Sequence, residues 1–257
     1  MVNFVGAGCG AKDLITVRGQ RLLQQADVVI YAGSLVNPAL LEETREGCET
    51  YDSAKMTLDE VLAVMERAEE RGLMTVRLHT GDPSVYGAIR EQMDRLSERG
   101  IPYEVCPGVS SFCGAAASLR AELTLPEVSQ TVILTRLAGR TRTPKKESFR
   151  ALAAHHATMA VFLSAGMLKE LEQELKAAGY EPETPAAIVY KATWPDEKTI
   201  RCTVSTLWAA AEREGITKTA IILIGDVLGS RKQNGYADSR LYAADFTTGF
   251  RKGRDKA

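Results

Sequence analysis

The chain has 257 residues, of which 45% are hydrophobic and 25% charged, and its formal net charge is −1. This balance is typical of a folded protein and excludes both a disordered chain and the strongly basic character of many nucleic-acid-binding domains. No apolar run approaches the ~20 residues of a membrane-spanning helix, and the N-terminus does not have the pattern of a signal peptide, so we expect a cytoplasmic protein.

Cysteine and histidine are too scattered to suggest a metal centre. The five cysteines form no Cys-x-x-Cys pair, and two of the three histidines, His155 and His156, are adjacent. This distribution favours neither a disulfide framework nor a zinc site. We therefore expect buried thiols and no protein-bound metal.

The first half of the chain alternates short apolar runs, typical of buried strands, with amphipathic stretches, typical of helices. Strands are predicted at 2–5, 28–31, 74–78 and 103–105. Helices are predicted at about 14–26, from the capping-box pattern at Thr57 to a stop at Gly72, from Ile89 to a stop at Gly100, and after Ser110.

A second series of the same kind begins near Gln130. Strands are predicted at 131–135, 159–163, 186–190 and 220–224, and helices around 146–154 and over Leu168, Leu171 and Leu175. Such alternation predicts an α/β fold with mixed, largely parallel sheets covered by helices on both faces. We expect two α/β/α domains, at 1–122 and 123–242, and a flexible tail at 243–257.

The glycine run after the first predicted strand matches a dinucleotide-binding pattern. Gly6, Gly8 and Ala11 stand where G-x-G-x-x-G/A requires them. A nicotinamide site would also need an acidic residue after the second strand, but 28–31 is followed by Ala32-Gly33-Ser34. A glycine turn that joins a strand to a helix explains the run equally well.

Two further loops follow predicted strands, where parallel sheets usually bind ligands. In Thr80-Gly81-Asp82-Pro83 the glycine permits a close approach of backbone to ligand, and the aspartate supplies an acceptor. In Pro107-Gly108-Val109-Ser110-Ser111 a serine would cap the next helix, whose free amides could hold a carboxylate. A capped turn without a ligand explains the first loop as well as a ligand crevice does, and explains the second better.

Two segments of the second series carry distinctive side chains. Five cations lie within 136–146, and arginines bind carboxylates bidentately, so this segment is either an anion site or a solvated basic loop. The segment 190–198 contains Trp194-Pro195-Asp196-Glu197, which is either one wall of a cleft or an aromatic packed under a loop.

Together these segments resemble the tetrapyrrole methylase family over about residues 1–228, and within it the enzymes that methylate C11 of precorrin-4 or cobalt-precorrin-4 in cobalamin biosynthesis. The marks that resemble the C11 enzymes in particular are Thr135-Arg136 with Gly139-Arg140-Thr141, and 190–197. One departure stands out, because the family's first loop commonly reads Gly-x-Gly-Pro-Gly-Asp-Pro. Here Cys9, Ala11 and Lys12 replace the proline, aspartate and proline, so any donor contact from this loop is in doubt.

The resemblance implies a homodimer whose two domains hold the donor S-adenosylmethionine in a cleft between them, with S-adenosylhomocysteine as product and neither nucleic acid nor membrane as partner. The implied donor contacts are Thr80, Gly81, Asp82, Val85, Ser110, Ser111, Leu163, Tyr190, Ala192 and Ala220. For the carboxylates of an anionic tetrapyrrole substrate we predict Arg18, Arg136, Arg140, Arg142 and Lys191. Asp82 and Tyr86 are the candidates at the reacting face.

Methyl transfer from a sulfonium needs alignment and exclusion of water more than an acid or a base, because the methyl group is already electrophilic. The missing catalytic triad in the sequence agrees with this chemistry. The alternatives are a methylase of the same fold that acts on a modified histidine, as diphthine synthase does, or on ribosomal RNA; the segment Trp194–Glu197 argues against both. A dinucleotide-dependent oxidoreductase and a non-catalytic tetrapyrrole carrier are the remaining alternatives.

Overall fold

The computed structural model describes residues 1–230 and 235–254, and its contacts divide the chain into two units. The first unit consists of Met1–Leu119, Val189–Thr199 and Thr219–Ile221, and the second of Arg120–Ile188, Ile200–Lys218 and Ile222–Ala257. Two short segments from the second half of the sequence thus group with the first unit. The predicted domain limits 1–122 and 123–242 remain a prediction, and 231–234 and 255–257, the latter in the predicted tail, lie outside the described residues.

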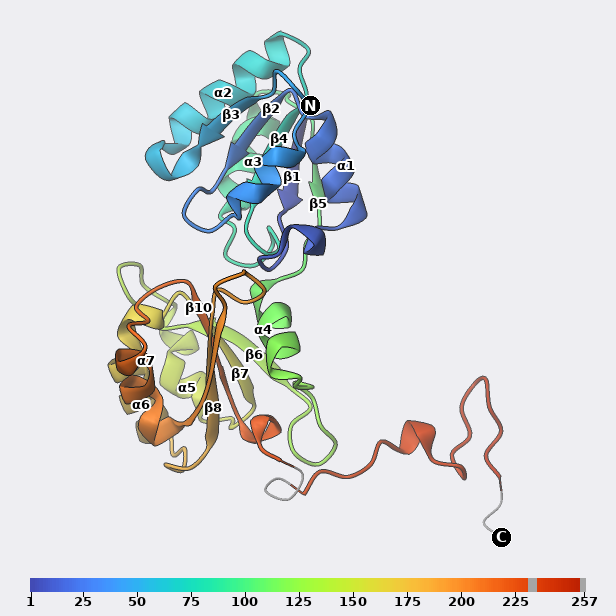
Figure 1. Cartoon of the computed structure of the whole chain (residues 1–257), viewed down its shortest axis with the longest axis vertical. Coiled ribbons are helices and arrows are strands. Elements are labelled where there is room, and N and C mark those ends of the chain that lie inside the picture. Colours follow the sequence, from blue (N-terminus) through green and yellow to red (C-terminus); the bar gives the residue numbers. More distant parts are fainter. Residues whose placement is uncertain (231–234, 255–257) are drawn as a thin grey trace. The chain divides into compact units, whose positions relative to one another are not determined.

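A five-stranded parallel sheet forms the centre of the first unit (Figure 1). Its strands, in order across the sheet, are β3 (Glu49–Asp52), β2 (Val28–Tyr31), β4 (Thr75–His79), β1 (Val2–Gly6) and β5 (Tyr103–Cys106). The helices are α1 (Val17–Gln25), α2 (Leu58–Glu70), α3 (Ile89–Glu98) and α4 (Ser111–Leu119).

Both faces of this sheet are buried, because parallel strands require helices on each side. On one face Phe4 and Ile30 pack in a cluster with Leu62 of α2 and Leu96 of α3. On the other face a second cluster contains Leu23 of α1. Strand β1, an inner strand of this sheet, is buried along its whole length, in agreement with the buried strand predicted at 2–5.

The second sheet is mixed. Its strand order is β6 (Val132–Arg136), β7 (Thr158–Phe162), β10 (Ala220–Ile224), β8 (Pro185–Tyr190) and β9 (Lys198–Thr203). Strand β7 pairs in parallel with β6 and antiparallel with β10. The accompanying helices are α5 (Phe149–Ala153), α6 (Leu168–Ala177) and α7 (Leu207–Arg213). One parallel and one mixed sheet, both with helices, confirm the predicted α/β fold class.

Three elements were not predicted, and each lacks a strong apolar pattern. Strands β3 and β9 are the edges of their sheets, and neither contains a fully buried residue. Helix α7 has only seven residues. These two strands and this short helix bury too little apolar surface for periodicity to reveal them, whereas the other two edge strands, β5 and β6, were predicted.

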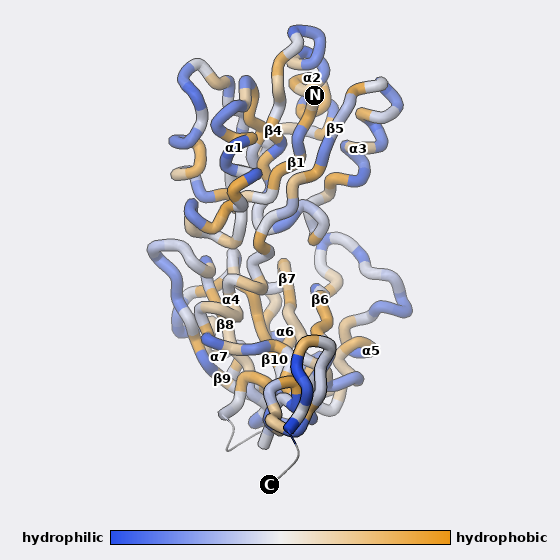
Figure 2. The backbone as a smooth tube through the Cα atoms, turned by 90° about the vertical axis from the view of Figure 1, so that its right-hand side faces the viewer, coloured by the Kyte–Doolittle hydropathy of each residue, from blue (hydrophilic) through white to orange (hydrophobic). Residues whose placement is uncertain are grey.

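Hydropathy follows the same layering. In Figure 2 the hydrophobic colour runs along strands such as β4 and β7, whereas α3 is largely hydrophilic. Within the described ranges, no helix combines the length and the hydropathy that crossing a membrane would require.

Replacing Leu62 by alanine tests the core of the first unit. Leu62 is 1% exposed, so we expect the cavity and the lost contacts to lower the free energy of unfolding by about 2–5 kcal/mol. Urea unfolding monitored by circular dichroism measures this change. Leu241→Ala is the control, because Leu241 is 53% exposed and its truncation should have little effect. Equal effects of the two substitutions would contradict the assignment of Leu62 to the core.

Candidate active site

The loops that follow β1 and β4 are joined backbone to backbone. Strands β4, β1 and β5 are neighbours in the parallel sheet, so their carboxyl ends lie along one edge of it. Gly81 N–H donates to Gly8 O at 2.9 Å, and Gly8 N–H donates to Gly81 O at 3.3 Å. The Gly81-Asp82-Pro83 loop is thereby held at the edge of the sheet where ligands usually bind.

The glycines of the first loop serve contacts within the chain. A Cβ on Gly6 would lie 2.5 Å from Gly108 Cα, and a Cβ on Gly10 would lie 2.3 Å from Ala192 O. No side chain fits at such distances, so the backbone there must be glycine. This packing explains the glycine pattern without a bound dinucleotide.

Asp82 connects the second loop to the third. Its Oδ2 accepts a hydrogen bond from Gly108 N–H at 2.8 Å, and its Oδ1 accepts one from Ser84 N–H at 2.8 Å. Burial acts to raise the pKa of Asp82, but the hydrogen bonds from Ser84 and Gly108 outweigh it and hold the pKa below its ordinary value. Asp82 is therefore an ionised acceptor committed to the loops, which makes it a poor general base.

Six of the predicted donor residues lie in the loops that follow β4 and β5 or at the start of α4: Thr80, Gly81, Asp82, Val85, Ser110 and Ser111. A Cβ on Gly81, whose φ is 62°, would lie 3.4 Å from Ser110 Cα and from Ser111 N. Helix α4 begins at Ser111, so Ser110 stands immediately before its free amides. Val85 follows in the turn, where its N–H donates to Asp82 O at 3.2 Å. Thr80 and Val85 are both half-buried.

A second group of predicted donor residues belongs to the first unit although it is distant in sequence. Lys191 N–H donates to Thr219 O at 2.9 Å, which joins the segment after β8 to the residue before Ala220. Thr193 Oγ1 accepts a hydrogen bond from Ala11 N–H at 2.9 Å. Tyr190, Ala192 and Ala220 thus share a unit with the Gly81 loop.

Leu163 is the one predicted donor residue outside the first unit. It follows β7, its φ is 53°, and its side chain is 64% exposed. Its contact with the donor remains a prediction.

Backbone strain is concentrated in these segments. Of the nine non-glycine residues found with positive φ in the described chain, six lie in or beside the predicted donor segments: Tyr86, Ala88, Leu163, Lys191, Thr193 and Thr219. Each such conformation costs about 1 kcal/mol or more and persists only where the surroundings fix it. Strain of this kind is typical of ligand sites.

The predicted substrate-binding cations fall into two classes. Arg136 uses its guanidinium on its own loop, since Nη1 donates to Leu137 O and Thr141 O, each at 3.1 Å. Lys191 Nζ lies 2.6 Å from Asp196 Oδ2, and this hydrogen bond is the main reason why the pKa of Lys191 is raised. The second class consists of Arg18, Arg140 and Arg142. These three side chains are exposed and have no ion-pair partner in the described part of the chain.

Beneath the Gly81 loop lies a buried basic pair that sequence reasoning did not single out. Arg77 donates to Gln92 Oε1 at 3.2 Å and to Ile30 O at 3.1 Å, and burial lowers its pKa to about 10. Burial, and after it the charge of Arg77, lowers the pKa of His79 to about 3. His79 therefore stays neutral at physiological pH. An arginine and a histidine in an otherwise apolar strand were the only signals of this pair.

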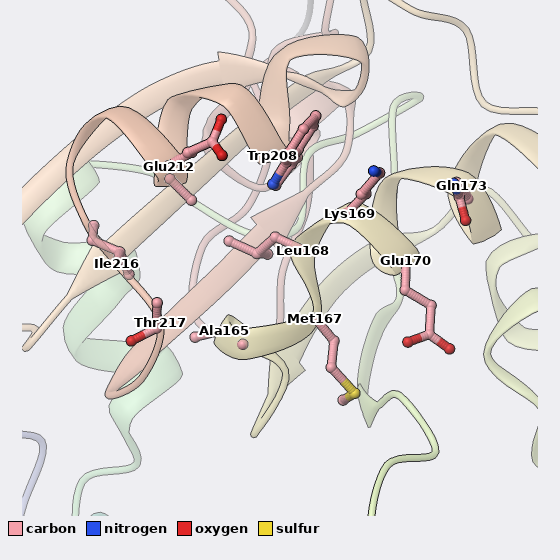
Figure 3. Close-up of a pocket in the computed structure, with 12 residues that line it drawn as sticks. Ala165, Met167, Leu168, Lys169, Glu170, Gln173, Trp208, Glu212, Ile216 and Thr217 are labelled. Atoms are coloured by element: carbon pink, nitrogen blue, oxygen red, sulfur yellow. The ribbon is translucent and has the colours of Figure 1, made fainter.

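A hollow of about 720 Å³ lies between α6 and α7 of the second unit (Figure 3). Lys169 Nζ is 4.7 Å from the centre of the Trp208 ring, and these two side chains lie side by side at its wall. None of its lining residues was predicted to bind donor or substrate. Over residues 1–230 and 235–254, no group of three or more potential metal ligands is present.

Comparison with known proteins gives a consistent result over nearly the whole chain. A sequence model of the family described as Tetrapyrrole (Corrin/Porphyrin) Methylases matches residues 1–207. The cobalt-precorrin-4 C(11)-methyltransferase of Methanocaldococcus jannaschii is 51% identical over 255 residues, which cover 99% of this chain and 97% of the relative.

Solved structures show the same similarity. The X-ray structure of a cobalamin biosynthetic enzyme, cobalt precorrin-4 methyltransferase, matches with a TM-score of 0.87 and 48% identity, over 89% of this chain and 96% of its own. A uroporphyrin-III C-methyl transferase from Thermus thermophilus, solved in complex with S-adenosylhomocysteine, matches with a TM-score of 0.73 and 28% identity, over 89% of this chain and 93% of its own.

Replacing Asp82 by alanine tests the connection between the loops. Loss of two backbone hydrogen bonds to a carboxylate should lower the free energy of unfolding at pH 7 by about 1–2 kcal/mol. Because the folded pKa is depressed, the stabilisation is present above the ordinary value of 3.8 and is lost as the pH falls below it. The deficit of the variant should therefore shrink between pH 6 and pH 3 in urea unfolding.

Asp94→Ala is the control, because Asp94 forms only an exposed ion pair with Arg90. A deficit of the Asp82 variant that is the same at pH 6 and pH 3 would contradict the role of the ionised carboxylate.

Proposed function

This chain belongs to the tetrapyrrole methylase family, and from that premise we propose that it transfers the methyl group of S-adenosylmethionine to C11 of precorrin-4 or cobalt-precorrin-4 in cobalamin biosynthesis. The observation that carries the proposal is the near full-length match to a relative named for this reaction. The sequence marks Thr135-Arg136 and Trp194-Pro195-Asp196-Glu197 support the same reaction.

The residues of the first unit fit the proposed donor. Gly81 presents backbone without a side chain, and the first amides of α4, next to Ser110 and Ser111, suit the carboxylate of the methionine part. Thr80, Asp82 and Val85 would complete this wall. The proposed contacts on the remaining sides are Leu163, Tyr190, Ala192 and Ala220.

When bound, the donor supplies an electrophilic methyl group on a sulfonium. The chain has to orient donor and acceptor and to exclude water. The methyl group is already electrophilic, so alignment of the reacting atoms contributes more to the rate than an acid or a base would. Asp82, held ionised by two backbone N–H groups, would fix the loop that aligns the donor. Tyr86, 46% exposed beside this loop, is the proposed neighbour of the reacting ring.

The acidic substituents of the tetrapyrrole would be bound by Arg18, Arg140 and Arg142, which are exposed and have no ion-pair partner among the described residues. Arginine suits this task because its guanidinium binds a carboxylate through two hydrogen bonds. Arg136 would act by shaping the 137–142 loop, and Lys191 by a charge shared with Asp196. We further propose a homodimer, as the family resemblance implies, and, from the sequence patterns, a cytoplasmic location and no metal of its own.

Incubation with precorrin-4 and with its cobalt complex tests the reaction. With labelled S-adenosylmethionine under anaerobic conditions, we expect one methyl group to be added at C11, as detected by mass spectrometry and carbon NMR. Comparison of the two rates identifies the preferred substrate. Binding of NAD with no binding of S-adenosylmethionine would instead support an oxidoreductase, and tetrapyrrole binding without methyl transfer would support a carrier.

Arg140→Ala tests the substrate side alone. Removing a cation that pairs with a carboxylate should raise the KM for the tetrapyrrole about tenfold, while the KM for S-adenosylmethionine stays unchanged. Lys145→Ala is a matched control, because Lys145 is exposed in the same basic segment and was not predicted to bind substrate. An unchanged tetrapyrrole KM in the Arg140 variant would remove that assignment.

A further inference from the structure

The turn between β8 and β9 is closed by one carboxylate. Glu197 Oε2 accepts a hydrogen bond from Thr193 N–H at 2.5 Å, and Glu197 Oε1 accepts one from Thr199 Oγ1 at 3.2 Å. The backbone inside this turn is strained, since φ is 45° at Lys191 and 66° at Thr193. The Glu197 carboxylate, which accepts from Thr193 N–H, restrains the backbone of Thr193 in this conformation, while the hydrogen bond from Ala11 N–H restrains its side chain.

The same carboxylate reaches a helix that lies far away in the sequence. Ser118 Oγ, in the last turn of α4, is 2.7 Å from Glu197 Oε2 and 3.0 Å from Gly114 O. Its single proton favours the carboxylate, because charge-assisted hydrogen bonds are the stronger ones. Glu197 thus ties the turn to the helix whose first amides lie beside Gly81.

Other contacts nearby support the link that Glu197 forms between the turn and helix α4. A Cβ on Gly114 would lie 3.4 Å from Thr193 Cγ2, so helix and turn are in van der Waals contact. The adjacent acid, Asp196, is engaged with Lys191 and does not share this role. Burial acts to raise the pKa of Glu197, but hydrogen bonds from Ser118, Thr193 and Thr199 hold it below its ordinary value, so the group is ionised at neutral pH.

We propose that Glu197 is a positioning residue for the methyl donor, which it serves by fixing the backbone of Ala192 against helix α4. This inference rests on the proposed function, because Tyr190 and Ala192 matter only if they contact the donor. Without the carboxylate, Thr193 can relax from its positive φ and carry the carbonyl of Ala192 with it. Part of the binding free energy of the donor is then used to restore the conformation of the turn, so the donor binds more weakly.

Glu197→Ala and Glu197→Gln test the proposal as a pair. The alanine variant should weaken S-adenosylhomocysteine binding in calorimetry about tenfold and raise the KM for S-adenosylmethionine equally, with a smaller rise in the KM for the tetrapyrrole, because Lys191 of the same turn is proposed to bind that substrate. The glutamine variant keeps an oxygen for Thr193 N–H and Ser118 Oγ–H, so it should recover most of that affinity. Glu183→Ala, at an exposed glutamate in the loop before β8, is the control and should behave as wild type.

Tryptophan fluorescence can report the conformation of the turn directly. The chain has two tryptophans, so Trp208→Phe leaves Trp194 of the turn as the only one. In that background we expect Glu197→Ala to shift the emission of the ligand-free protein, and Glu197→Gln to leave it near wild type. Should the alanine variant fail to fold, Ser118→Ala removes one donor only, and about a twofold to threefold loss of donor affinity is expected.

The outcomes separate the two ideas. Wild-type affinity of Glu197→Ala for S-adenosylhomocysteine, or an equal rise in both KM values, would overturn the positioning role while leaving the methyltransferase function intact. Absence of S-adenosylhomocysteine binding by the wild-type protein would overturn the proposed function and this inference with it.

Discussion

Close packing of backbone on backbone at the carboxyl edge of the first sheet is the constraint on which the candidate site depends. The contact between Gly6 and Gly108 and the paired hydrogen bonds between Gly8 and Gly81 bring three loops to one place. The Asp82 carboxylate links two of those loops by hydrogen bonds. The carbonyl oxygen of Ala192 lies so close to Gly10 that no side chain fits there. Glycine is required there by the chain itself, whatever ligand is bound.

Much of the fold could be predicted because the strands that carry it are buried. The apolar runs at 28–31 and 220–224 match β2 and β10 residue for residue, and the Thr57 capping box begins α2 one residue later. Strands β3 and β9 and helix α7 were not predicted because they bury too little apolar surface to produce a regular apolar pattern. The candidate loops were recognised by composition, but only the fold shows that residues 192 and 193 contact the loop at 9–11, since no local sequence pattern encodes such a contact.

The positions of the charged residues could be read from the sequence, but their interaction partners could not. Five cations in one segment were visible, yet the sequence does not say which of them are used internally. Arg136 donates to carbonyls of its own loop, whereas Arg140 and Arg142 remain exposed. Likewise Asp196 and Glu197 are adjacent acids with different partners. Asp196 forms an ion pair with the Lys191 side chain, whereas Glu197 accepts a hydrogen bond from the backbone N–H of Thr193. Hydrogen-bond partners, not residue types, distinguish their roles.

The loop held by Arg136 has a further consequence. The hydrogen bonds of Arg136 lie within 136–142, and Leu137 N–H donates to Ser164 Oγ of the same unit at 3.0 Å, so the shape of this loop owes little to the glycine contacts of the first unit. Three of the proposed substrate cations, Arg136, Arg140 and Arg142, therefore lie in a loop of the second unit, apart from the proposed donor loops of the first unit. Under the proposed function, a substitution at Arg140 or Arg142 would change the tetrapyrrole side of the site and leave the backbone contacts among Gly6, Gly8, Gly81 and Gly108 as they are.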